Sequence, residues 1–401
     1  MKIIIFTEKT RFGGLDLFII NLIKNWPNDT DSFTVICNEN SPNIAYLNDN
    51  LPERAELICH SIPLNWSFLS IIIRYLPNIL QRIFRQIIRI LLIPYQYFKI
   101  YRLLRSIDSD ALISVNGSYP GGETCRWANI IWHKLGRGRS IHNVHNFAIK
   151  PRFYNKILEN YIDGILFKSV SMFVGVSKSC SSSLLIRKSF HDNKLTTIYN
   201  GIELNDNKSQ TIRDILNLTS DIPIVMMIGT YEERKGHKFL FQSMRYVYEN
   251  NKKIQLVIIG SGTKKEKKNI LTLIDSIIPD VRVHLLGEYK NAGSLIKGSN
   301  VLVIPSQDEE SFGLPAVEAM LSRVPVITTN IGGLPETIGL NSDCGYVVDS
   351  NDPIQLSEKI LYLIDNPEIS HQMGVNGSKR AKEYFSPGEM SKNYHRLLNM
   401  N

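Results

Sequence analysis

The stretch EESFGLPAVEAM (309–320) places two glutamates, Glu310 and Glu318, around an apolar segment that contains one glycine and one proline. It follows the apolar run VLVIP (301–305), which suits a buried strand, and its second half suits a short helix. One carboxylate is therefore expected in the loop and the other on the flank of the helix. Carboxylates accept hydrogen bonds from neighbouring hydroxyls, which is how proteins bind sugars and riboses. The spacing alone leaves open that Glu310 caps the helix and Glu318 is solvated.

The same order of strand, loop and helix repeats along the chain. Short apolar runs occur at 3–6, 33–37, 111–115, 140–144, 172–176 and 196–199, and again at 224–229, 256–260, 283–287, 301–305, 325–329 and 345–348. Most are apolar along their whole length, which is typical of parallel strands covered on both faces. The sequence therefore predicts an α/β protein with two Rossmann-like, doubly wound domains that face each other across a cleft.

Polar composition suggests where the domains end. We expect an N-terminal domain over 1–203, a linker over 204–221, a second domain over 222–380 and a C-terminal helix in 381–401 that returns to the first domain. Ser386, Pro387 and Glu389 mark the start of the last helix, as an N-cap, a first helical residue and a capping-box glutamate.

The composition narrows the class of protein. The 401 residues are 43% hydrophobic, which indicates a globular chain long enough for two cores. Five widely spaced cysteines without a C-x-x-C pattern argue against a zinc site or a disulfide framework and favour a reducing cytosol. The start MKIIIFTEKT has too few apolar residues for a signal peptide and suits a first strand.

Phosphate-binding features follow the first strand of each half. Gly13 and Gly14 open the first helix, where backbone N–H groups can approach an anion. Arg234 and Lys235 follow the strand at 224–229, at the start of a helix, and could hold a diphosphate without a metal. A tight turn at the glycines and a solvated loop at the cations are the alternatives.

No metal site is expected. The two D-x-D strings, at 29–31 and 108–110, precede strands instead of following them. His142 and His145 leave a strand together but lack a third ligand nearby, so a single cleft histidine that contacts substrate fits better than a metal pair.

Several motifs together resemble the family-four glycosyltransferases, which are retaining enzymes of the GT-B fold. They are GTYEERKG (229–236), ESFGLPAVEAM (310–320) and PVITTNIGGLPE (325–336), with GVS (175–177) and IYNGIE (198–203) upstream. Their order and spacing agree with that family over almost the whole chain, and the second half is the most specific part.

The resemblance implies a role for each motif residue. Glu318 would bind the ribose hydroxyls of a nucleotide sugar, and Glu310 would bind hydroxyls of the transferred sugar. Lys235 would hold the diphosphate, helped by backbone N–H groups around Phe312, Gly313 and Leu314.

From the first domain, Gly14 would close on the phosphates and His145 would face the donor sugar and the acceptor. The sequence departs from the family at two places. Thr230 stands where an arginine is common, so Arg234 is the candidate replacement. A glycine that usually precedes the next proline is replaced near Arg323.

The resemblance implies transfer of a hexose, with retention, from a nucleotide diphosphate sugar to a glycan or lipid-linked acceptor, in surface-polysaccharide assembly. A UDP-sugar is expected ahead of a GDP-sugar, with no metal or other cofactor. A sugar-nucleotide epimerase of the same fold is the alternative enzyme. The basic, aromatic run YQYFKIYRLLR (95–105) suggests a nucleic-acid-binding protein as the alternative of another class, although no nucleic-acid partner is expected.

The basic character of the chain is local. Residues 57–107 contain seven Arg and Lys residues and no Asp or Glu, in a chain of net charge +8. The run PNILQRIFRQIIRILLI (77–93) predicts a helix that Pro94 ends, with Arg82, Arg85 and Arg89 on one arc of an otherwise apolar wheel. We expect this helix to lie on an anionic membrane surface at the cytoplasmic face, too interrupted by arginine to span it. An ordinary helix buried against the first domain is the alternative.

Overall fold

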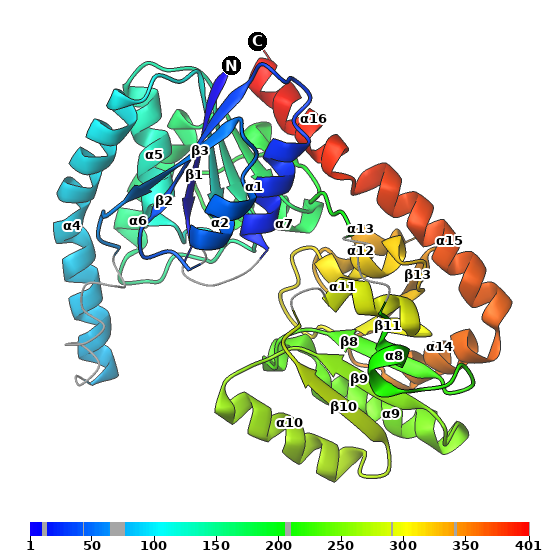
Figure 1. Ribbon diagram of the computed structural model, residues 1–401. Helices are drawn as coiled ribbons and strands as arrows, with labels where there is room; N and C mark the ends of the chain where they lie inside the picture. Colours follow the sequence, from blue (N-terminus) through cyan, green and yellow to red (C-terminus); the bar gives the residue numbers. More distant parts are fainter. Residues whose placement is uncertain are drawn as a thin grey trace. The chain divides into compact units, whose positions relative to one another are not determined.

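The computed structural model describes residues 1–9, 14–42, 44–64, 77–204, 210–289, 292–340 and 343–400. They form two units (Figure 1). The first unit comprises Met1–Ile198 and Met390–Asn401, and the second comprises Tyr199–Glu389.

The first unit is built on a parallel sheet of seven strands in the order β3-β2-β1-β4-β5-β6-β7. The strands are β1 (Lys2–Glu8), β2 (Ser32–Asn38), β3 (Ala55–His60), β4 (Ala111–Asn116), β5 (Ser140–Val144), β6 (Met172–Gly175) and β7 (Leu195–Thr197). The α-helices are α1 (Leu15–Lys24), α2 (Ile44–Asn50), α4 (Asn78–Ser106), α5 (Glu123–Lys134), α6 (Lys156–Ser169), α7 (Lys178–Ser183) and most of α16 (Pro387–Asn399), and the short 3₁₀ turns are η1 (Leu184–Ile186) and η2 (Asp192–Lys194).

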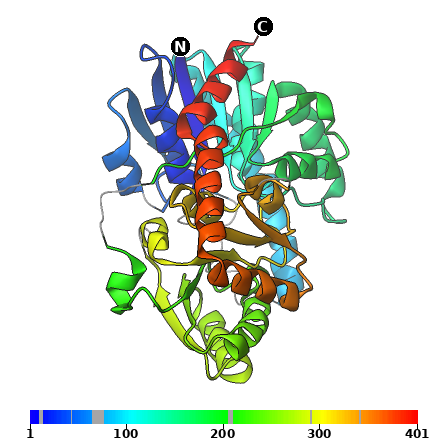
Figure 2. The ribbon, with the colours of Figure 1, turned by 90° about the vertical axis from the view of Figure 1, so that its right-hand side faces the viewer.

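The C-terminal helix α16 completes the core of the first unit. Its Met390, Tyr394 and Leu398 belong to the same buried cluster as Ile3 and Ile5 of β1. The Tyr394 hydroxyl accepts a hydrogen bond of 2.7 Å from the side-chain amide of Asn143 on β5. Figure 2 shows α16 in red along the sheet of this unit.

The second unit is built on a parallel sheet of six strands in the order β10-β9-β8-β11-β12-β13. The strands are β8 (Ile224–Ile228), β9 (Gln255–Ile259), β10 (Arg282–Gly287), β11 (Val301–Ile304), β12 (Val326–Thr329) and β13 (Gly345–Val348). The helices are α8 (Ile212–Leu216), α9 (His237–Asn250), α10 (Lys264–Ile277), α11 (Ala292–Leu295), α12 (Leu314–Leu321), α13 (Leu334–Ile338), α14 (Pro353–Asp365) and α15 (Pro367–Tyr384), with 3₁₀ turns η3 (Glu233–Lys235) and η4 (Ile296–Gly298).

The expected fold class of two doubly wound, parallel α/β units is confirmed. Each sheet reverses its strand order once, between β1 and β4 in the first unit and between β8 and β11 in the second. In open sheets of this kind, ligands bind at the carboxyl ends of the strands at such a switch point. These two switch points are therefore the expected positions of a ligand-binding site in each unit.

Two local expectations differ from the structure. Part of the expected linker, 204–221, is packed into the second unit, because α8 buries Ile212 against Gly298 and Arg213 donates a hydrogen bond to the side chain of Asn300.

Pro94 was expected to end a helix, but α4 continues through it to Ser106. Proline costs a helix a hydrogen bond. The turns beyond it are held by the burial of Gln96, Ile100 and Leu104.

The long helix α4 runs along the outside of the first unit (Figure 1). Across the described part of the chain, no helix combines the length and the apolar character needed to cross a membrane.

Candidate functional site

The switch point of the second sheet brings together most of the predicted donor-binding residues. The loop after β8 carries Arg234 and Lys235, and the loop after β11 carries Glu310 before it enters α12. Because β8 and β11 are neighbours in a parallel sheet, both loops leave its carboxyl edge side by side.

The centre of this site is an ion pair between Lys235 and Glu310. Lys235 Nζ lies 2.6 Å from Glu310 Oε2, and the Ser306 hydroxyl donates a hydrogen bond of 3.0 Å to the same oxygen. The two charged side chains are 17% and 11% exposed, so water competes little with their attraction. The alternative of a solvated loop lysine is therefore wrong.

Backbone contacts hold the two loops against each other. Gly236 has φ +79°, and a Cβ there would lie 1.8 Å from the Pro305 carbonyl oxygen, so only glycine fits. The Gln307 N–H donates a hydrogen bond of 2.7 Å to the Arg234 carbonyl. The loop that carries the cation is thus fixed to the loop that carries the carboxylate.

Arg234 takes part in this loop structure. Its Nε lies 2.5 Å from Glu232 Oε2, and its Nη1 donates a hydrogen bond of 3.0 Å to the Glu309 carbonyl. The side chain remains 35% exposed. Arg234 would have to leave both acceptors to replace the arginine that the family places at Thr230.

Phe312, Gly313 and Leu314 lie at the amino end of α12. Gly313 caps the helix with φ +84°, a left-handed conformation in which a Cβ would meet the Leu334 side chain. The Phe312 carbonyl accepts a hydrogen bond from Thr337, and the Glu310 carbonyl accepts one from the Gly333 N–H. The start of α12 is thereby fixed, with the positive end of its dipole at the end of the loop that carries Glu310.

Glu318 lies one turn into α12, partly buried against α11. A Cβ on Gly293 would come within 3.0 Å of the Glu318 carboxyl carbon, so glycine makes room for the carboxylate. Among the described residues, this carboxylate has no hydrogen-bond partner. Burial raises the pKa of Glu318 to about 7. A desolvated carboxylate without donors is suited to accept hydrogen bonds from ligand hydroxyls.

In the first unit, the structure brings His145 beside the first helix. Gly14 is the N-cap of α1, and the His145 ring packs edge-on against Phe18, one turn further, with centroids 4.5 Å apart. Gly13 lies outside the described residues. Burial lowers the pKa of His145 to about 3, so the imidazole is neutral at pH 7, and its buried Nε2 has no partner in the described residues.

His142 has a different role, inside the core of the first unit. Its Nδ1 lies 2.7 Å from the Ser114 hydroxyl, and burial lowers the pKa of this histidine to about 3. The two histidines therefore do not form a pair, because His142 lies within β5 against Ser114, whereas His145 follows the strand and packs against Phe18.

The three arginines predicted to face a membrane divide into two groups. Arg82 and Arg85 are exposed on α4. Arg89 is not a surface residue, which corrects the expectation. It is buried and forms ion pairs with Glu123 at 2.7 Å and Glu159 at 2.5 Å. The helical wheel placed it with the exposed arginines because it could not show these partners, which lie on α5 and α6.

The run at 95–105, which suggested nucleic-acid binding, is the second half of α4. The cations of the helix cover its exposed aromatic rings, since Lys99 lies over Tyr95 at 5.5 Å and Arg102 lies over Phe98 at 5.6 Å. Stacking of bases on these rings would first displace those cations.

Both D-x-D strings help to fix the start of β1. Asp31 pairs with the N-terminus and accepts a hydrogen bond from the Trp26 indole. Asp108 and Asp110 accept hydrogen bonds from the side chain and the backbone N–H of Lys2. Within the described ranges, no three His, Cys, Asp or Glu side chains gather as ligands for a metal ion.

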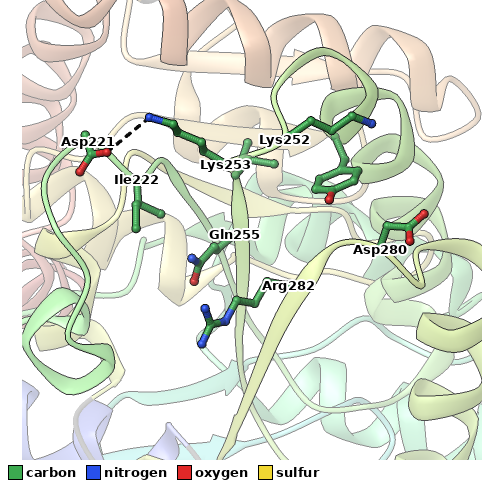
Figure 3. Close-up of a pocket in the computed structure, with 9 residues that line it drawn as sticks. Asp221, Ile222, Lys252, Lys253, Gln255, Asp280 and Arg282 are labelled. Carbon is green, nitrogen blue, oxygen red and sulfur yellow. Dashed lines mark ion pairs between the residues drawn. The ribbon is translucent and has the colours of Figure 1, made fainter.

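A separate hollow of about 380 Å³ lies on the second unit (Figure 3). Its lining includes Gln255 and Arg282, which begin β9 and β10, so it opens at the amino edge of the sheet. The Lys253–Asp221 ion pair of 3.6 Å at its rim is exposed. Lys235 and Glu310 lie at the opposite edge, and this hollow is no part of their site.

Sequence reasoning missed Ser306 and Gly333 at the ion pair of the second unit, and Phe18 beside His145 in the first unit. The contact of Phe18 with His145 joins segments far apart in the chain, and nothing local indicates it. Ser306 follows β11 directly and precedes Glu310 by four residues, which is a signal that could have been used.

Two parallel α/β units, with candidate ligand residues at the switch points of both sheets, define a class of protein: the GT-B fold. Solved structures of this class match the whole chain. A glycosyltransferase from Rickettsia africae has a TM-score of 0.78 at 16% identity, with 99% of this chain and 97% of that chain covered. The HepE protein of Anabaena, solved in complex with UDP, has a TM-score of 0.76 at 16% identity, with 99% of each chain covered.

Residues 208–380 match the family model for Glycosyl transferases group 1, and the chain carries a domain of that family. The capsular polysaccharide biosynthesis glycosyltransferase CapM of Staphylococcus aureus is 28% identical, over 55% of this chain and 60% of CapM. N-acetyl-alpha-D-glucosaminyl L-malate synthase of Bacillus anthracis is 28% identical, over 51% of this chain and 53% of that protein. The chain thus matches between half and three-fifths of the length of these two relatives.

Proposed function

We propose that this protein is a retaining glycosyltransferase that moves a hexose from a nucleotide diphosphate sugar to a hydroxyl of a glycan or a lipid-linked acceptor. The observation that carries the proposal is the Lys235–Glu310 pair at the switch point of a sheet within a glycosyltransferase group 1 domain. A UDP-sugar is the first donor to test, because the structurally similar Anabaena protein binds UDP.

The reaction leaves a diphosphate anion, and the site offers fixed positive charge to stabilise it. Lys235 and the amino end of α12 would meet the negative charge as it develops, without reorganisation at the moment of reaction. Glu310, released from Lys235, would accept hydrogen bonds from the sugar. This arrangement needs no metal ion.

The first unit would supply the remaining contacts. His145 is neutral, so it can accept a hydrogen bond as well as donate one, which suits a residue that faces sugar hydroxyls. Gly14, at the start of α1, would approach the phosphates through its backbone.

The acceptor side of the proposal rests on α4. Eight of its large apolar side chains are between 42% and 70% exposed: Leu80, Ile83, Phe84, Ile87, Ile90, Leu91, Tyr95 and Phe98. Arg82 and Arg85 stand among them, and residues 57–107 contain no acidic residue. Such a surface suits a helix lying in the plane of an anionic membrane, where lipid-linked acceptors and surface-polysaccharide precursors are available. We propose that the protein works at the cytoplasmic face of a membrane.

The experiment that tests the reaction is a thermal-shift screen with UDP-, GDP- and ADP-sugars, followed by product analysis with and without EDTA. A donor at a hundredfold excess over its Kd should stabilise the protein by about 2.7 kcal/mol. The transferred sugar should keep its anomeric configuration, and EDTA should leave the rate unchanged. An epimerised nucleotide sugar formed without any acceptor would instead identify the alternative enzyme.

A further inference from the structure

The helix α6 buries two carboxylates and exposes two large apolar side chains near its amino end, although its Ile162 and Leu166 are also buried. Its acidic residues Glu159 and Asp163 are 1% and 0% exposed, whereas Ile157 and Tyr161 are 89% and 68% exposed. Residues two positions apart lie roughly 160° apart around a helix, so the carboxylates and the exposed apolar side chains occupy opposite faces. Surface helices normally bury the apolar face and expose the charged one.

The buried face of α6 is held by a cluster of ion pairs. Glu159 lies 2.6 Å from Arg187, 3.0 Å from Arg126 and 2.5 Å from Arg89 of α4. Asp163 lies 2.7 Å from Arg187. Although burial alone would raise the pKa of Glu159, the three arginines lower it to about 2, so the Glu159 carboxylate stays ionised near neutral pH. The orientation of α6 is therefore fixed.

The exposed face of α6 continues into the turn before it. Phe153 is 90% exposed and, with Ile157 and Tyr161, forms a line of side chains spaced four residues apart, here termed the apolar ridge. The turn is ordered by a hydrogen bond of 3.1 Å from the Asn155 N–H to the Arg152 carbonyl. Upstream, Arg187 donates a hydrogen bond of 2.8 Å to the Ile149 carbonyl. The ridge is thus presented by a braced segment of backbone.

The charges around the ridge indicate what covers it. Residues 146–158 contain Lys150, Arg152 and Lys156 and no Asp or Glu. All three cations have exposed side chains. Exposed aliphatic and aromatic side chains in a segment that also exposes three cations match the boundary between acyl chains and anionic headgroups. A nucleic acid would pair with the cations but would leave Ile157 uncovered.

We propose that the apolar ridge is a second membrane-contact element, which inserts into the same anionic bilayer as α4. The direct ion pair between Arg89 of α4 and Glu159 of α6 fixes the two elements relative to each other. Two contacts at fixed positions set the orientation of the first unit on the bilayer, whereas a single helix would let the unit rotate about the axis of that helix. The proposal rests on the membrane association proposed above for α4 and is independent of the identity of the donor sugar.

The test measures the partitioning of the full chain onto vesicles of phosphatidylglycerol and phosphatidylethanolamine, with phosphatidylcholine vesicles for comparison. The Phe153→Ser/Ile157→Ser variant should bind the anionic vesicles roughly tenfold more weakly or worse, because it removes two large apolar side chains whose burial in the bilayer favours binding. The matched control is Leu340→Ser/Ile354→Ser, which removes two exposed apolar side chains from the second unit and should bind as the wild type does. A Phe153→Trp variant should bind as the wild type does, and the emission of the introduced tryptophan should be quenched by lipids that carry a quencher high on the acyl chain.

Three results would overturn the proposal: unchanged vesicle binding by Phe153→Ser/Ile157→Ser, no binding by the wild type, or a dimer in solution that this variant converts to a monomer. Binding of UDP-sugars without vesicles, measured in parallel, should be equal in all variants. Loss of vesicle binding with intact UDP-sugar binding separates failure at the membrane from failure of the proposed reaction.

Discussion

Lys235 Nζ lies 2.6 Å from Glu310 Oε2, so the cation assigned to the diphosphate and the carboxylate assigned to the sugar bind each other. A nucleotide sugar would replace this one contact by two, phosphate on lysine and hydroxyls on glutamate. The pair keeps both charges compensated until then, which matters because an unpaired, partly buried charge is costly.

This pairing predicts opposite effects of Glu310→Gln on two ligands. UDP lacks the transferred sugar that Glu310 is proposed to bind, so it gains nothing from Glu310, and the variant frees Lys235 for its phosphates. We expect UDP to bind roughly tenfold more tightly or better, since a hydrogen bond to a charged group contributes about 1.5–3 kcal/mol and each 1.4 kcal/mol is about tenfold in affinity. Sugar transfer should fall sharply. Titration calorimetry with UDP and a transfer assay measure the two effects, and weaker UDP binding would contradict the competition.

Lys235→Ala should weaken binding of both UDP and UDP-sugar and lower turnover by roughly 10²–10³-fold, the cost typical of losing one group that stabilises a developing anion. Lys238→Ala is the control, because Lys238 is an exposed lysine three residues away on α9. Equal kcat values for the two variants would show that Lys235 takes no part in the reaction.

The raised pKa of Glu318 predicts that the free energy of unfolding depends on pH. Because burial raises its pKa to about 7, the folded protein holds this proton more tightly than the unfolded chain. The contribution of Glu318 to the free energy of unfolding is therefore present below the unfolded pKa and is lost as the pH rises to about 7. Relative to the wild type, Glu318→Gln should gain about 1–3 kcal/mol between pH 5 and pH 8.

Urea denaturation at the two pH values measures this gain. Glu358→Gln, which removes an exposed glutamate from α14, controls for the loss of a negative charge. Parallel pH profiles for wild type and Glu318→Gln would show that Glu318 is ionised in the folded protein throughout this range.

The sequence predicted what depends on local pattern. Within the described ranges, twelve of the thirteen strands follow from apolar runs, whereas β3 (Ala55–His60) was missed because it is a partly exposed edge strand without such a run. The loop glutamate and the helix glutamate follow from the strand–loop–helix order around Glu310. Contacts over long distances could not be predicted in this way. The partners of Arg89 lie on other helices, and the neutral state of His145 depends on its packing.

Arg323 shows how a departure from the family pattern is accommodated. It has φ +59°, directly after the C-cap of α12, where glycine is the usual residue of a helix end. A left-handed conformation costs a non-glycine residue about 1–2 kcal/mol. Glycine would avoid this cost, but part of the gain is lost because glycine gives the unfolded chain more conformational freedom. We expect Arg323→Gly to raise the free energy of unfolding by about 0.5–1 kcal/mol. Arg323→Ala, which keeps the Cβ, should not raise it in a denaturation experiment.

We expect Arg89 to stabilise the folded protein and not to contact a membrane. Arg89→Met keeps the apolar stem of the side chain but leaves Glu123 and Glu159 with fewer cations in a buried cluster. Removing one partner of a buried ion pair typically costs about 3–5 kcal/mol, and the remaining Arg126 and Arg187 place the expected loss near the lower value. Arg85→Met, one turn earlier on the exposed side of α4, should change stability by less than about 0.5 kcal/mol. Denaturant midpoints of the two variants measure the difference, and equal losses would show that the ion-pair cluster does not hold α4.

The vesicle experiments should therefore use a folded Arg82→Glu/Arg85→Glu variant. Arg89→Glu would be unsuitable, because unfolding of the protein could not be told apart from lost membrane binding.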